Sequence, residues 1–227
     1  MKRVMAPISS TKKKLQSLDF DAHWYRRVFH AFGSSFVVYY MLPDTIEWIA
    51  FLKMWVPISV LTLAFFLEIA RVQGVISGSH FFGLRMYEQK RVGSYLFFAS
   101  GIVILLYFFP QQIAVPCILC ACLADPIMGE ARYRFGKKEA YAIGFLVCLL
   151  FFVVTWYKAD LWVMMVAAFI GSIGAVLGES VNAWWLDDDF MIQLTPALLL
   201  LMFLIGVEAM GVTALPEPII YPSLLPW

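Results

Sequence analysis

Long apolar runs alternate with short charged stretches along most of the chain, and this pattern predicts a set of membrane helices. A helix needs about 20 mostly apolar residues to cross a bilayer core about 30 Å thick. Crossings and short loops therefore account for most of the sequence, and we expect an all-α polytopic membrane protein with about seven transmembrane helices. The apolar segments cover residues 28–42, 46–69, 93–109, 112–128, 141–157, 161–182 and 190–208.

The composition agrees with this pattern. Of the 227 residues, 62% are hydrophobic and only 15% are charged, which is typical of a polytopic membrane protein and leaves no room for a separate soluble domain. We divide the chain into a basic tail (1–25), a transmembrane domain (26–210) and a proline-rich tail at the outer interface (211–227).

The basic residues predict the orientation. With seven crossings, every Lys and Arg except Lys53 and Lys158 falls on the side of the amino terminus. Cytoplasmic loops of membrane proteins carry an excess of Lys and Arg. We therefore expect an integral membrane protein with a cytoplasmic amino terminus and an outer carboxyl terminus.

The stretch ACLADPIMGEARYRFGKKEAY, residues 121–141, combines a carboxylate, glycines and basic groups at the cytoplasmic end of the fourth segment. We expect Asp125 to end that segment, because Pro126 and Gly129 should interrupt the helix. A carboxylate is a hard ligand for Mg²⁺, and Arg and Lys neutralise phosphate oxygens, which glycine allows backbone N–H groups to approach. This combination suits a nucleoside triphosphate. The basic residues of the stretch are Arg132, Arg134, Lys137 and Lys138. The alternative is that they only orient the chain in the membrane.

The loop WWLDDDFM, residues 184–191, is a cytoplasmic connection without a basic residue. Its three aspartates, Asp187 to Asp189, predict a second Mg²⁺ locus, with Glu179 about two turns earlier. The alternative is a solvated turn in which Asp189 is the N-cap of the last helix.

Two further groups of polar residues lie at predicted helix ends. Arg26, Arg27 and His30 share the cytoplasmic end of the first helix, where they either contact a phosphate or anchor the helix among lipid head groups. Glu68 and Arg71 have the spacing of an intrahelical pair, whose role is either structural or catalytic.

The loop of residues 71–93 predicts an interfacial helix. Phe81 and Phe82 would face lipid, whereas Arg85 and Glu88 would face water. Such a lip between lipid and water is where a lipid hydroxyl would meet an aqueous phosphate donor.

The cysteines offer a weaker signal. Cys117 and Cys120 have C-x-x-C spacing, but no second pair or histidine accompanies them, so we favour buried packing over a zinc site for all four cysteines.

The order of these motifs resembles the dolichol kinase and phytol kinase family of membrane lipid kinases. The similar stretches are RRVFH (26–30), EIAR (68–71), LRMYEQKRVGSYLF (84–97), LADPIMGEARYRFGKK (123–138) and GESVNAWWLDDDF (178–190). The family has Gly-Asp where this chain has Ala124-Asp125. The resemblance implies a transmembrane kinase domain that transfers the γ-phosphoryl group of CTP to a membrane lipid alcohol, with Mg²⁺ and without nucleic acid.

From the motifs and the resemblance together we predict four sets of site residues. The catalytic residues are Asp125, Glu179, Arg27 and His30. The nucleotide-binding residues are Gly129, Arg132, Gly136, Lys137, Lys138, Arg71 and Arg85. The metal ligands are Asp125, Asp187 and Asp188, and the substrate lip is formed by Glu68, Phe81, Phe82 and Glu88.

Other functions remain as alternatives. They are a diacylglycerol kinase of the same family, an enzyme that forms or uses a CDP-alcohol, and a lipid transporter without catalysis. DPIMGEAR is superficially similar to the start of the CDP-alcohol phosphotransferase motif, but the later aspartates of that motif are missing. A transporter predicts charged residues along a path through the bilayer, whereas here they gather on one side.

Overall fold

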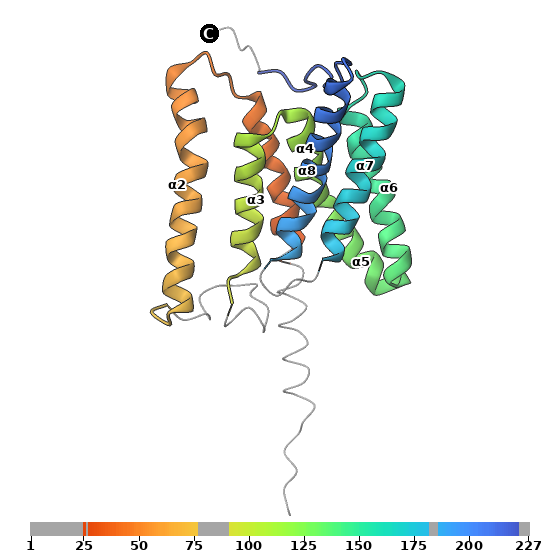
Figure 1. The fold of residues 1–227 in the computed structure, drawn as a ribbon. Coiled ribbons are helices and arrows are strands. Elements are labelled where there is room, and N and C mark those ends of the chain that lie inside the picture. Colours follow the sequence, from red (N-terminus) through yellow and green to blue (C-terminus); the bar gives the residue numbers. More distant parts are fainter. Residues whose placement is uncertain (1–24, 26, 77–90, 182–185, 223–227) are drawn as a thin grey trace, which may run out of the picture.

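The protein is all-helical in the part of the chain that the computed structural model describes, residues 25, 27–76, 91–181 and 186–222. No strand occurs in these residues, so the all-α prediction is confirmed. The helices run between two ends of one bundle (Figure 1). They are η1 (Ser34–Met41), α2 (Glu47–Val72), α3 (Ser94–Phe108), α4 (Gln111–Leu119), η4 (Cys120–Ala124), α5 (Asp125–Phe135), α6 (Lys137–Thr155), α7 (Leu161–Ser180) and α8 (Asp188–Ala209).

Helix lengths identify a membrane protein. Among the described residues, five helices are long and apolar enough to cross a bilayer: α2, the continuous helix α4–η4–α5, α6, α7 and α8. Helix α3 is apolar but has 15 residues. The helical residues 27–33 continue into η1, which is a 3-10 helix. The expected seven crossings thus require α3 and this first helical stretch to cross as well.

The continuous helix from Gln111 to Phe135 is the central element, since 67% of its most apolar window is buried, against 11% for α2. Helix α7 packs against α8 through small residues, including Gly174 and Gly178, as is common between membrane helices. All four cysteines are buried in this core, which confirms the prediction that they are packing residues.

The structure corrects the expected end of the fourth segment. Asp125 does not end a helix but begins α5, which continues to Phe135. Pro126 is the second residue of α5 and directly follows the π turn of the continuous helix, and Gly129 is an ordinary helical residue. The irregular part lies upstream, in the π turn of Cys120–Ala124. The chain turns at Gly136, whose φ of 103° favours glycine, and α6 begins at Lys137 rather than at residue 141.

Helix α2 lies at the edge of the bundle (Figure 1), and its buried side chains are polar and lie toward its two ends. Of its residues, Lys53, Glu68 and Arg71 are buried in the described structure. Lys53 pairs with Asp44 at 2.6 Å. Between these polar contacts, a groove with a volume of about 290 Å³ separates α2 from α3. The lining residues are Leu61, Thr62, Phe65, Phe66, Leu96 and Ser100.

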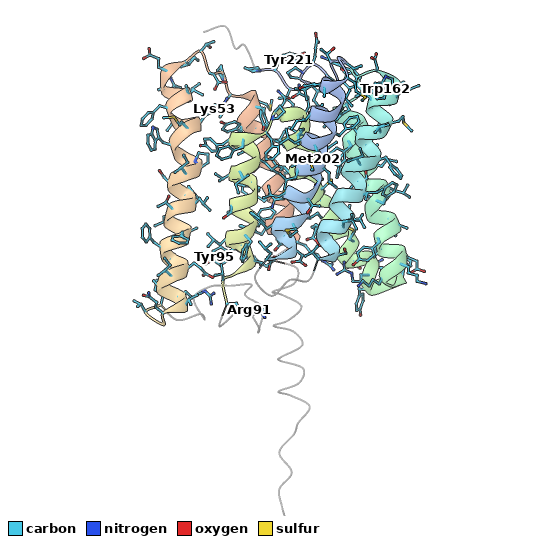
Figure 2. All side chains as sticks on the ribbon, in the orientation of Figure 1. Lys53, Arg91, Tyr95, Trp162, Met202 and Tyr221 are labelled. Atoms are coloured by element: carbon cyan, nitrogen blue, oxygen red, sulfur yellow. The ribbon has the colours of Figure 1, made fainter. Side chains whose placement is uncertain are left out.

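The two ends of the bundle differ in chemistry. At one end, which we term the acidic end, α7 finishes at Ser180 and α8 starts at Asp188. At the opposite end, the described part of the proline-rich tail contacts α4. Gln112 of α4 donates a hydrogen bond to the carbonyl of Pro216. Figure 2 shows Tyr221 of this tail at the end opposite to Tyr95 and Arg91.

Candidate functional site

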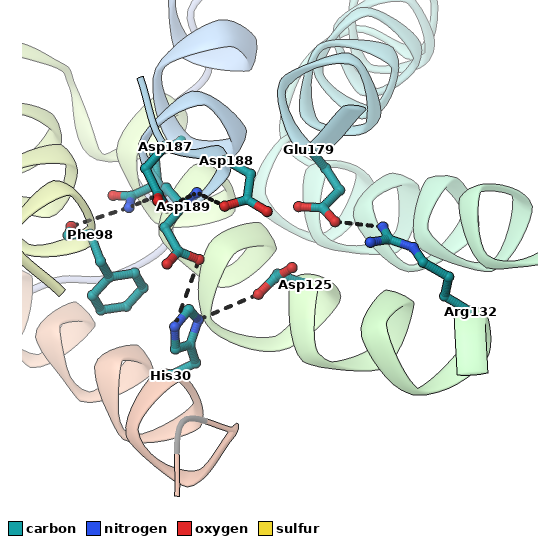
Figure 3. Close-up of polar contacts among 9 residues, drawn as sticks. His30, Phe98, Asp125, Arg132, Glu179, Asp187, Asp188 and Asp189 are labelled. Carbon is teal, nitrogen blue, oxygen red and sulfur yellow. Dashed lines mark hydrogen bonds and ion pairs between the residues drawn. The ribbon is translucent and has the colours of Figure 1, made fainter. Parts of the chain in front are cut away.

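Acidic side chains from three helices meet at the acidic end and face His30 of the first helical stretch (Figure 3). We term this group the acidic pocket: His30, Asp125 of α5, Glu179 of α7, and Asp187, Asp188 and Asp189 at the start of α8. Asp125 and Asp188, which are 63 positions apart in sequence, therefore lie at one end of the bundle. His30, Glu179 and Asp189 are each at most 6% exposed.

His30 lies between two carboxylates. Its Nδ1 is 3.5 Å from Oδ2 of Asp125, and its Nε2 is 3.7 Å from Oδ1 of Asp189. The imidazole also packs against the ring of Phe98 in α3, with centroids 4.7 Å apart. The π turn before Asp125 adds a residue to the helix, and π turns inside α-helices are frequent at functional sites. Because the extra residue rotates the positions that follow it around the helix axis, the π turn sets the direction of the Asp125 side chain.

The three aspartates of the DDD run have different surroundings. Asp187 is the N-cap of α8, and its carboxylate accepts a hydrogen bond of 3.1 Å from the backbone N–H of Asp189. Asp188 and Asp189 occupy the first helical turn, where the helix dipole favours negative charge. Asp189 is buried, so the run is not simply a solvated turn, and the N-cap is Asp187 rather than Asp189.

Glu179 is paired on one side only. Arg132 of α5 donates a 2.6 Å hydrogen bond to Oε1 of Glu179. The other oxygen, Oε2, is buried and has no hydrogen-bond partner among the described residues. The charges of Asp125 and Asp188 act on this carboxylate, and Figure 3 shows it directed toward them.

Gln193 supports the pocket and was not predicted. It lies one turn after Asp189 in α8 and is fully buried. Its Nε2 donates hydrogen bonds to the carbonyl of Asp189 at 2.7 Å and to that of Phe98 at 3.2 Å. Gly101 of α3 leaves the space for this side chain, since a Cβ there would lie 2.6 Å from Oε1 of Gln193. The amide therefore ties α8 to α3 beside the pocket, and a single glutamine in an apolar helix gives little signal in sequence.

Basic residues border the pocket on the α5–α6 side. Arg132 and Lys137 both lie over the ring of Tyr141, each 5.6 Å from its centroid. Arg27 pairs with Glu130 at 2.6 Å, and Arg134 pairs with the same carboxylate. Glu130 thus pairs with both Arg27 and Arg134, a role that the sequence did not predict. Lys138 is exposed at the start of α6.

Several predicted site residues lie elsewhere. Gly129 is inside α5, so its backbone is part of a helix and not of a phosphate-binding loop. Arg71 donates two hydrogen bonds of 2.7 Å to Glu68, which also accepts hydrogen bonds from Gly93 and Tyr95. This buried cluster joins α2 to α3. Phe81, Phe82, Arg85 and Glu88, together with the expected interfacial helix, lie outside the described residues.

The electrostatics of the pocket favour a bound cation. Burial raises the pKa of the Asp187 carboxyl to about 8, and the nearby charges of Asp189 and Asp188 add to this increase. His30, Asp125 and Asp189 each offer one ligand atom, and these atoms lie within 4.8 Å of one another. The same holds for Asp187, Asp188 and Asp189. Oxygen-rich donor sets of this kind fit Mg²⁺ or Mn²⁺.

Comparisons with known protein families, with curated proteins and with solved structures gave no match to this chain. The acidic pocket and the sequence motifs are therefore the features that bear on function.

Proposed function

We propose that the protein is a membrane lipid kinase that transfers the γ-phosphoryl group of CTP to the hydroxyl of an isoprenoid alcohol, such as a dolichol, polyprenol or phytol. In this proposal the chain crosses the membrane seven times and the acidic end faces the cytoplasm. The excess of Lys and Arg on that side supports the orientation.

The observation that carries the proposal is the convergence of Asp125, Glu179 and the Asp187–Asp189 run on His30 at one end of the bundle. A group of buried carboxylates is costly unless positive charge compensates it, especially at the edge of a membrane. Their presence in one pocket indicates a bound cation, and Mg²⁺ accompanies nucleoside triphosphates in phosphoryl transfer. Transport along a charged path is not favoured, because the described carboxylates of the pocket gather at a single end.

The residues of the pocket have separate roles in this reaction. Asp125 and the aspartates of α8 would hold Mg²⁺, which supplies charge neutralisation to the phosphates when bound. Arg132 pairs with Glu179 of the pocket, and Lys137 lies over the same Tyr141 ring as Arg132. Together with Lys138, the next residue of α6, they would neutralise phosphate oxygens. Glu179 or His30 accepts the proton of the lipid hydroxyl, because both are within the pocket and can hold a proton.

The reaction balances without a further reactant. The oxygen of the lipid alcohol forms a bond to the γ-phosphorus, and the bond between that phosphorus and the β,γ-bridging oxygen breaks. The products are the lipid monophosphate, CDP and the hydroxyl proton.

The groove between α2 and α3 supports a lipid acceptor. Its lining is largely apolar, and both helices are apolar along the same depth of the bundle. Leu96, which lines this groove, and Phe98, which packs against His30, are both in the first two turns of α3. A hydrocarbon chain in the groove would therefore be separated from the acidic pocket by one helix.

The test uses purified protein in lipid bilayers with Mg²⁺. It combines CTP, ATP, GTP or UTP, each labelled in the γ-phosphate, with a panel of isoprenoid alcohols and diacylglycerol. We expect a labelled lipid monophosphate and CDP from CTP and an isoprenoid alcohol. Labelled diacylglycerol phosphate would favour a diacylglycerol kinase, and release of pyrophosphate would favour a CDP-alcohol-forming enzyme. Absence of any lipid phosphate with all four nucleotides would exclude the kinase.

A further inference from the structure

Gln193 of α8 connects two residues that contact the His30 ring. Its Nε2 donates hydrogen bonds to the backbone carbonyls of Asp189 and Phe98. The carboxylate of Asp189 is 3.7 Å from Nε2 of His30, and the ring of Phe98 packs against the imidazole with centroids 4.7 Å apart. Figure 3 shows both side chains beside the imidazole. One amide therefore fixes the spacing between the backbones of two residues that meet at the same ring.

The amide of Gln193 is a costly side chain for this place. Gln193 is fully buried, and its Oε1 has no hydrogen-bond partner among the described residues. An unpaired buried oxygen lowers stability, so an apolar side chain of similar size would pack α8 against α3 at least as well. Both carbonyls also lie inside helices, where backbone N–H groups serve them. The amide is therefore not needed to satisfy them, and its contribution is the fixed spacing beside His30.

Gly101 of α3 is the second unfavourable choice in this contact. A Cβ on Gly101 would lie 2.6 Å from Oε1 and 2.9 Å from Nε2 of Gln193, so glycine leaves the space in which the amide lies. Glycine inside a helix is less stable than alanine. Two locally unfavourable residues that fit each other are typical of a functional position.

The spacing matters because it sets the distances between possible ligands of a cation. The ligand atoms of His30, Asp125 and Asp189 lie within 4.8 Å of one another. Two ligands that are each about 2.1 Å from one ion lie at most about 4.2 Å apart. Small displacements of Asp189 or His30 therefore change how well the pocket fits an ion, and groups that orient the ligands strongly affect metal affinity.

We propose that Gln193 is a positioning residue of the acidic pocket, which holds Asp189 and the His30 ring at the separation from Asp125 that one divalent cation requires. Gln193 acts through the backbones of Asp189 and Phe98, and Gly101 acts by leaving room for the amide. This inference deepens the proposed function and rests on it for the cation in the pocket.

Binding of Mn²⁺ alone tests this role without nucleotide or lipid. The purified full chain in detergent is titrated with Mn²⁺, and electron paramagnetic resonance measures the free ion. Gln193→Met replaces the amide with an apolar side chain of similar length. We expect its Mn²⁺ affinity to fall about 10–100-fold, while the midpoint of thermal unfolding without metal stays close to the wild-type value.

Thr195→Val is the matched control. Thr195 lies two residues further along α8, and its hydroxyl is likewise buried without a hydrogen-bond partner among the described residues. This variant removes a buried polar group from the same helix at almost constant side-chain size. It should bind Mn²⁺ as the wild type does.

Gly101→Ala separates positioning from packing. It should weaken Mn²⁺ binding about as much as Gln193→Met, because the new Cβ displaces the amide. In a chain that already carries Gln193→Ala, the same substitution should have no further effect, since the amide is absent. This pair of backgrounds also tests the proposal if Gln193→Met does not fold.

Wild-type affinity in Gln193→Met, or an equal loss from Gly101→Ala with and without Gln193, would overturn the proposal. An equal loss in Thr195→Val would also overturn it, because the effect would then come from helix packing. A wild type that binds no Mn²⁺ would refute the cation site together with this inference. The expected losses in a protein without kinase activity would sustain the inference and refute only the proposed function.

Discussion

The backbone of Met191 in α8 leaves no room for a side chain at Gly178 in α7: a Cβ on Gly178 would lie 2.3 Å from the carbonyl oxygen of Met191. This close approach brings Glu179, the next residue, to the start of α8 and therefore to Asp188. Because the obstacle is backbone rather than a flexible side chain, a larger residue must separate the two helices.

Gly178→Ala should thus weaken the acidic pocket. We expect a lower thermal stability and a smaller stabilisation by Mg²⁺ in thermal unfolding of the detergent-solubilised protein. Gly206→Ala is the control, since a Cβ there meets nothing within 4 Å and alanine is a better helix former. Equal effects of the two substitutions would show that the contact between α7 and α8 does not position Glu179.

The pKa of Asp187 predicts a pH dependence of metal binding. Its pKa is about 8 in the folded protein and 3.8 in an ordinary environment. The folded protein therefore holds this proton more tightly, and the resulting stabilisation is full below about pH 4 and is lost as the pH rises to about 8. A cation beside Asp187 displaces the proton, so Mg²⁺ affinity should rise several-fold between about pH 6 and pH 8.

Calorimetric titration at several pH values measures this change and the protons released. Asp187→Asn should flatten the dependence while it preserves the start of α8, because asparagine is an equally good N-cap. An unchanged pH dependence in this variant would assign the proton to another group.

The ion pair between Glu68 and Arg71 should stabilise the attachment of α2 to α3. Arg71→Met leaves a buried carboxylate without its cation, which typically lowers the free energy of unfolding by about 3–5 kcal/mol. Arg134→Met removes an exposed pair, which solvent screens, and should lower the free energy of unfolding far less. Thermal unfolding in detergent compares the two variants, and a similar effect of both would contradict a structural role for the buried pair.

Filling the groove between α2 and α3 should weaken binding of the lipid alcohol without affecting CTP. Thr62→Trp places a large ring in the groove, so KM for a long-chain alcohol should rise while KM for CTP stays unchanged. Val60→Trp adds the same ring to α2 at a residue that does not line the groove and is 59% exposed. A rise in KM for the lipid alcohol in both variants, or in neither, would show that its hydrocarbon chain does not bind in this groove.

The sequence predicted the helices better than their interruptions. Apolar runs locate α2, α6, α7 and α8 within a few residues, because a membrane helix needs a length of apolar sequence that few other structures share. Pro126 and Gly129 were expected to interrupt the helix, but both lie inside α5. Pro126 is accommodated there because it directly follows the π turn, where α-helical hydrogen bonding is already interrupted. The π turn upstream of Asp125 has no comparable signal in a single sequence.

The candidate site was partly predictable for a similar reason. Carboxylates are rare in apolar segments, so Asp125, Glu179 and the DDD run stood out. Their division of roles depends on three-dimensional packing: Asp189 faces His30, whereas Asp187 caps α8. The partners Glu130 and Gln193 could not be recognised, because their importance arises from contacts with residues distant in the chain.

The most direct test of the central claim is transfer of a labelled γ-phosphoryl group from CTP to a polyprenol in bilayers, with wild type and Asp125→Asn compared at equal folded concentration. We expect Mg²⁺-dependent polyprenyl phosphate formation by the wild type and a loss of at least about 100-fold in the variant. Equal rates for the two proteins, or no transfer by the wild type to any lipid alcohol, would contradict the assignment of the acidic pocket as a phosphoryl-transfer site.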